Sequence, residues 1–84
     1  MVEEDAHQRE LAQQLRREIS ATKRAILTLA DRGQAEGGRT LDWAVVASRA
    51  RQLATGCASQ RDTDVLGMIA AQLQALCFDA ETGL

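Results

Sequence analysis

The chain has 84 residues, a net charge of −2, no proline, no tyrosine and two cysteines. A chain of this length forms one domain, here residues 1–84, which buries only about 60 to 65% of the surface that it exposes when unfolded. The small net charge favours neither a strongly basic nucleic-acid binder nor a heavily acidic mimic. Ala, Leu, Gln, Arg and Glu dominate and β-branched residues are sparse, so the composition predicts an all-α fold.

The first predicted helix covers residues about 4–31. Its apolar residues follow spacings of four, three, four and three, which is the a/d pattern of helices that pack on other helices. We expect the helix to end near Asp31, because Gly33 can adopt the left-handed conformation that terminates helices. The apolar row consists of Leu15, Ile19, Thr22, Ile26 and Leu29, with Ala12 extending it and Leu11 and Leu27 beside it.

The next segment, RGQAEGGRT (residues 32–40), contains three glycines and predicts a flexible loop. Thr40 is the expected N-cap of a second helix at about 41–55, and Asp42 suits its first turn. Gly56 supplies a stop signal. This helix repeats the a/d spacing in Trp43, Val46, Ala50, Leu53 and Cys57.

A third helix is predicted at about 60–79, capped by Ser59 or by Asp62 and followed by a frayed tail, AETGL. Phe78 and Met68 lie beside its main apolar row, and together with Val65 they indicate a second apolar face. The main row consists of Leu66, Ile69, Leu73, Leu76 and Ala80.

Three such rows predict an antiparallel three-helix bundle with coiled-coil-like packing at shallow crossing angles. The first helix is nearly twice as long as the second, so we expect it to overhang its neighbours. Leu11 and Leu15 on that overhang would leave apolar surface that a homodimer or a larger protein could cover. Trp43 fits either a core position or an exposed interface anchor.

Basic residues recur every seven positions along the first helix. One interpretation is contact with the phosphates of a nucleic acid, although no aromatic residues alternate with the cations for base stacking. The interpretation that we favour is a stripe that flanks a helix interface and pairs with acids such as Asp62, Asp64 and Asp79. A helix-turn-helix arrangement is disfavoured, because two aspartates would open its recognition helix. The basic residues are Arg9, Arg16, Arg17, Lys23 and Arg24.

No combination of residues predicts catalysis, a cofactor or a metal ion. His7 is the only histidine, and no nucleophile motif, phosphate-binding loop or Cys-x-x-Cys pair is present. Cys57 and Cys77 are separated by about 25 Å along a continuous helix, beyond the limit of about 7 Å for a disulfide. We therefore expect both cysteines to act as small apolar residues.

The sequence favours a small non-enzymatic protein–protein interaction or regulatory protein of the adaptor, inhibitor or chaperone type. No apolar run approaches the ~18 residues of a membrane span, and the acidic N-terminus is unlike a signal peptide. We expect a cytoplasmic protein, and the Ala- and Arg-rich composition indicates a bacterial, phage or plasmid origin. The alternative is a nucleic-acid-binding regulator that uses the basic stripe. The expected protein contacts are Leu11, Leu15, Trp43 and Phe78.

Overall fold

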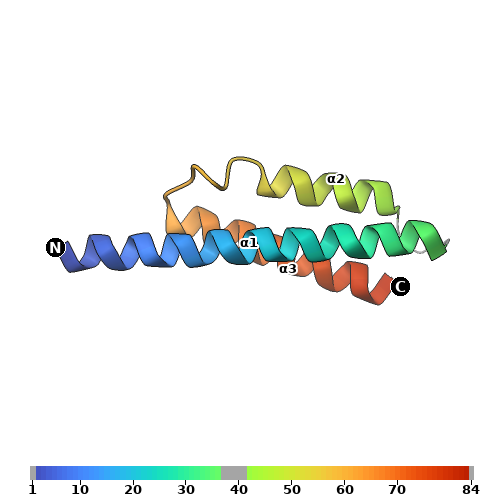
Figure 1. Ribbon diagram of the computed structural model, residues 1–84, viewed down its shortest axis with the longest axis horizontal. Coiled ribbons are helices and arrows are strands. Elements are labelled where there is room, and N and C mark those ends of the chain that lie inside the picture. The colour runs from blue at the N-terminus through green and yellow to red at the C-terminus, as the bar shows by residue number, and fades with distance from the viewer. Residues whose placement is uncertain (1, 37–41, 84) are drawn as a thin grey trace.

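Three helices run alongside one another in the computed structural model (Figure 1). They are α1 (Val2–Glu36), α2 (Trp43–Ala54) and α3 (Thr63–Gly83), and the structure describes residues 2–36 and 42–83. Successive helices run in opposite directions, so α3 is parallel to α1 (Figure 1). This arrangement confirms the predicted all-α three-helix bundle.

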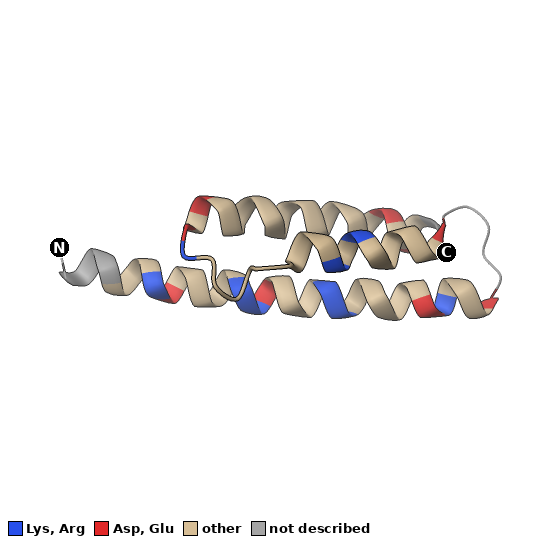
Figure 2. Ribbon diagram, turned by 90° about the horizontal axis from the view of Figure 1, so that it is seen from above, with Lys and Arg blue, Asp and Glu red and all other residues tan. Residues whose placement is uncertain are grey.

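The longest helix, α1, forms the spine of the molecule. At 1.5 Å per residue, its 35 residues span about 52 Å, which matches the longest dimension of the 53 × 19 × 15 Å molecule. Both α2 and α3 pack against it, and its N-terminal end projects beyond them (Figures 1 and 2). The predicted overhang is therefore present.

The core is made of aliphatic side chains together with Trp43 and Cys57, and it follows the predicted rows. Ile19 and Ile26 of α1 and Leu66 and Leu73 of α3 are fully buried. Among the described residues, no polar or charged side chain is buried. The other buried apolar residues are Ala12, Ala30, Trp43, Val46, Ala50, Cys57, Ala70 and Ala80.

Helix α1 is longer than predicted, and the proposed stop at Gly33 was wrong. Gly33 lies inside the helix and is buried, with the Trp43 indole against it. A Cβ atom at this position would overlap Cε2, Cδ2 and Nε1 of that ring. The glycine is needed for close helix packing rather than for helix termination.

Helix α2 begins two residues later than predicted. Asp42, in an extended conformation, is its N-cap and accepts a hydrogen bond from the Val45 backbone N–H at 3.4 Å. Thr40, the expected cap, lies outside the described residues. The helix closes at Thr55, and Gly56 follows with a φ of 80°, as expected of a helix stop.

The connection to α3 consists of successive turns, so Cys57 is buried in a turn and not on a helix. Ser59 donates its hydroxyl to the Gly56 carbonyl, whereas Asp62 caps α3. The Asp62 carboxylate accepts from the Asp64 N–H at 2.9 Å, and its carbonyl accepts from Leu66. Of the two caps that the sequence left open, the structure shows Asp62.

The predicted frayed tail was also wrong, because α3 continues to Gly83. Ala80 is completely buried, so packing holds the last turn of the helix in place. None of the described helices is both long and apolar enough to cross a membrane.

Candidate interaction surfaces

Helix α3 carries apolar residues on two faces. From Val65 to Phe78 the sequence contains no charged residue. One face is buried in the core. On the opposite face, four apolar residues spaced three, four and three positions apart are exposed to solvent. We call this exposed row the α3 outer face, and it consists of Met68, Ala71, Ala75 and Phe78.

The α3 outer face holds two of the three large apolar side chains that are exposed in the described chain. Met68 is 61% and Phe78 is 65% exposed, and the third, Val45 on α2, is 58% exposed. A surface helix normally presents polar residues on its solvent side, and a helix that is apolar on all sides is normally buried. The outer face of α3 is therefore an unpartnered apolar surface in the monomer.

A shallow groove of about 460 Å³ lies between α1 and α3, beside this face. Its floor on the α1 side is made of small residues, Ala21 and Ala25, and both are exposed. On the α3 side the Phe78 ring forms part of the wall. Thr22, Gln74, Cys77 and Glu81 complete the lining.

Cys77 is a free, half-buried thiol in this groove. Its Sγ lies 3.8 Å from the Glu81 carboxylate and donates a hydrogen bond to Oε1. Burial, followed by the Glu81 charge and this hydrogen bond, raises the pKa of the Cys77 thiol above its ordinary value. The thiol is thus held in its neutral, less nucleophilic form.

The four residues that were expected to contact another protein differ in their burial. Phe78 is on the surface, Leu11 is half-buried, and Leu15 packs against the core. Trp43 is only 4% exposed, so of its two possible roles the structure shows the core role. The exposed alanines of α1 and α3 were missed, although the second apolar row of α3 could have indicated those on that helix.

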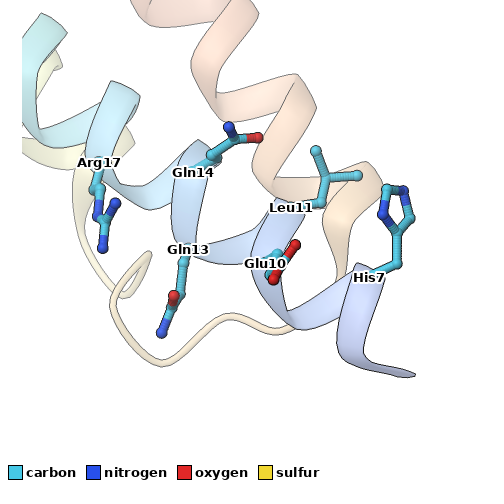
Figure 3. Close-up of a pocket in the computed structure, with 6 residues that line it drawn as sticks. All are labelled: His7, Glu10, Leu11, Gln13, Gln14 and Arg17. Carbon is cyan, nitrogen blue, oxygen red and sulfur yellow. The ribbon is translucent and has the colours of Figure 1, made fainter. Parts of the chain in front are cut away.

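Leu11 also lines a small hollow of about 260 Å³ near the overhanging end of α1 (Figure 3). All six lining residues come from successive turns of this one helix, and Figure 3 shows their side chains pointing in different directions. The residues of the hollow therefore do not converge on a common point. The other five are His7, Glu10, Gln13, Gln14 and Arg17.

The basic residues of α1 do not form one continuous surface. Arg16 is half-buried and donates two hydrogen bonds to the Gln60 carbonyl, from Nε at 3.2 Å and from Nη2 at 2.8 Å. Lys23 is half-buried, whereas Arg9, Arg17 and Arg24 are exposed. Contact with a nucleic acid through all five residues stays a prediction, but the Arg16 guanidinium already binds the Gln60 carbonyl and so joins α1 to the connection between α2 and α3.

Within the part of the chain that the structure describes, no three His, Cys, Asp or Glu side chains gather around a possible metal position. Comparison of the chain with protein-family models, with curated proteins and with solved structures finds no match.

Proposed function

We propose that this protein is a non-enzymatic interaction protein that works through the α3 outer face and the adjoining groove, and that the first occupant of this surface is a second copy of the chain. The observation that supports the proposal is the exposed apolar row of α3, which includes Met68 and Phe78. An exposed apolar row of this kind is typical of surfaces that bind protein.

The shape of the surface favours a second copy. In a two-fold dimer, the same patch lies on both sides of the interface, so it must offer both a projecting group and a hollow. Here the exposed Phe78 ring projects beside a groove whose floor is Ala21 and Ala25. Phe78 of each copy can fill the groove of the other.

The charges around the groove support the same pairing. The charged residues of α3 are all acidic, Asp64, Asp79 and Glu81, whereas the exposed surface of α1 carries both signs, with Arg17 and Arg24 as well as Glu18. Two α3 helices packed directly on each other would bring like charges together. A dimer in which α1 of one copy lies against α3 of the other brings opposite charges together instead.

Dimerisation would also stabilise a chain of this size. A short chain buries a small share of its surface on folding, and association is a common way to bury more. Adaptors, inhibitors and chaperones use exposed apolar helix faces of this kind to hold partner helices. We infer that the dimer is the working form of the protein.

The test is the molar mass of the full chain in solution, measured by light scattering at micromolar concentration. We expect a dimer for the unaltered chain and a monomer for the double variant Met68→Ser/Phe78→Ser. Val45→Ser removes a similarly exposed apolar side chain from α2 and should stay dimeric. A monomeric unaltered chain, or a dimer that survives the double substitution, would contradict the proposal.

A further inference from the structure

A second hollow, of about 790 Å³, lies on a different side of the molecule from the α3 outer face, between the N-terminal half of α1 and the connection from α2 to α3. Figure 2 shows this connection passing alongside a basic stretch of α1. Three arginines from two separate elements line the hollow, Arg9 and Arg16 from α1 and Arg61 from the connection. Heptad spacing places the first two on one face of the helix.

Arg16 is held in place before any ligand binds. Its Nε and Nη2 donate to the Gln60 carbonyl at 3.2 and 2.8 Å, and the side chain is half-buried. A guanidinium has five N–H groups in a planar fork, so three remain for a ligand. The bond to Gln60 also ties the position of Arg61, the next residue, to that of α1.

No carboxylate is found among the described residues that line the hollow. The ion pair found among the described side chains joins Arg32 and Glu36, at the other end of α1. Asp62, next to Arg61, uses its carboxylate to cap α3, and Glu10, next to Arg9, lines the other hollow of α1. Three arginines therefore line one concave surface, and no acid stands among its described lining residues, which favours a multiply charged anion.

The remaining polar lining can donate hydrogen bonds. Gln8 accepts a hydrogen bond from the Thr63 hydroxyl at Oε1, at 3.0 Å, so its amide NH₂ stays available. The exposed amide of Gln13 lines the same hollow. Oxyanions prefer such N–H donors, and arginine binds phosphate through two parallel hydrogen bonds.

We propose that this hollow binds a small ligand that carries phosphate groups, with Arg16 as the fixed donor and Arg9 and Arg61 closing on the anion. Arg9 and Arg16 come from α1 and Arg61 comes from the connection, so the three arginines line one hollow from two sides and do not all follow α1. That arrangement fits a compact phosphate group better than the extended backbone of a nucleic acid, whose charges repeat along a line. A ligand bound there would bridge α1 and the connection, and so would stabilise the folded chain.

The experiment titrates the full chain with inorganic pyrophosphate in a calorimeter, at constant ionic strength, and follows the melting temperature in parallel. We expect saturable binding and a higher melting temperature. The double variant Arg9→Gln/Arg61→Gln should weaken binding at least about tenfold. Neither side chain makes a hydrogen bond or ion pair to another described residue, so this variant should fold normally, which circular dichroism checks.

The matched control is Arg49→Gln/Arg51→Gln, which removes the same charge from the exposed surface of α2 outside the hollow and should leave the affinity unchanged. Absence of pyrophosphate binding, or equal weakening by both double variants, would overturn the proposal. A short DNA duplex provides a second arm. Duplex binding without pyrophosphate binding would also overturn the proposal, because it would assign these arginines to a nucleic-acid backbone.

Discussion

The contact between Gly33 and Trp43 shows how one missing side chain brings two helices together. The indole of Trp43 lies where a Cβ of residue 33 would be. We expect Gly33→Ala to lower the free energy of unfolding by about 1–3 kcal/mol, because the forced displacement of the ring outweighs the gain in helix propensity of about 1 kcal/mol. Urea unfolding followed by circular dichroism measures the change.

Gly67 is the matched control for this substitution. It lies inside α3, and an added Cβ would have no atom within 4 Å. Gly67→Ala should therefore raise the free energy of unfolding by about 0.5–1 kcal/mol, the usual helix-propensity gain. A loss of stability at Gly67, or a gain at Gly33, would contradict this account of the two glycines.

Cys77 provides a prediction that depends on pH. Because its pKa is raised in the folded chain, the neutral thiol contributes stability below the unfolded pKa, and that contribution is lost as the pH rises through the folded pKa. At about pH 8, alkylation of Cys77 by iodoacetamide should be slower than alkylation of an unperturbed cysteine.

Glu81→Gln tests the cause of this effect, because it removes the carboxylate charge and leaves a side chain of nearly the same size. Alkylation of Cys77 should become faster in this variant. Peptide mass spectrometry separates Cys77 from Cys57, which is buried in the turn. An unchanged rate at Cys77 would show that burial alone controls the thiol.

At the scale of the elements, the sequence predicts which residues of each helix face the core. The a/d rows of α1 and α3 include the fully buried residues Ile19, Ile26, Leu66 and Leu73, and the row of α2 includes its buried residues Trp43, Val46 and Ala50. The same rule identifies Phe78 and Met68 as members of a second apolar face, because a helix places residues three and four apart on one side. Periodicity is thus sufficient to predict the three-helix bundle and two of the four residues of the α3 outer face.

The helix ends are less predictable, because tertiary contacts override local signals there. Glycine commonly ends helices, yet α1 extends past Gly33 to Glu36, because Gly33 packs against Trp43. Burial of Ala80 extends α3 in the same way. Local signals succeed at Gly56 and Asp62, where the chain turns, whereas at the start of α2 the structure shows Asp42 as the N-cap in place of the expected Thr40.

The rest of the candidate surfaces depends on which segments meet in space. The groove combines Ala21 and Ala25 with Phe78, and the arginine hollow adds Arg61 to Arg9 and Arg16. Phe78 is distant in sequence from the two alanines, and Arg61 is distant from the two arginines of α1, so no helical periodicity relates them. The path of the connection between α2 and α3 decides their proximity, and sequence patterns do not specify that path.

For the molecule as a whole, the proposed dimer makes stability depend on concentration. Association stabilises the folded state by mass action, so the melting temperature of the unaltered chain should rise with protein concentration. The monomeric variant Met68→Ser/Phe78→Ser should melt at a temperature that is independent of concentration. Differential scanning calorimetry over a hundredfold range of about 1–100 µM measures both, and a concentration-independent unaltered chain would argue against the dimer.

A core made almost entirely of hydrocarbon has no directional bonds between its helices, so individual contacts outside it help to fix the axial register. In this bundle, Trp43 on Gly33 fixes the register at one end, and Arg16 on the Gln60 carbonyl fixes it at the other, where Thr63 also donates to Gln8. On α1, Arg16 and Gly33 are 17 residues apart, or about 25 Å. The chain from Trp43 to Gln60, which consists of α2 and the turns that follow it, must span the same length as this segment of α1. Insertions in α1 between Arg16 and Gly33 would break this match, whereas changes in length before Gln8 would leave it intact.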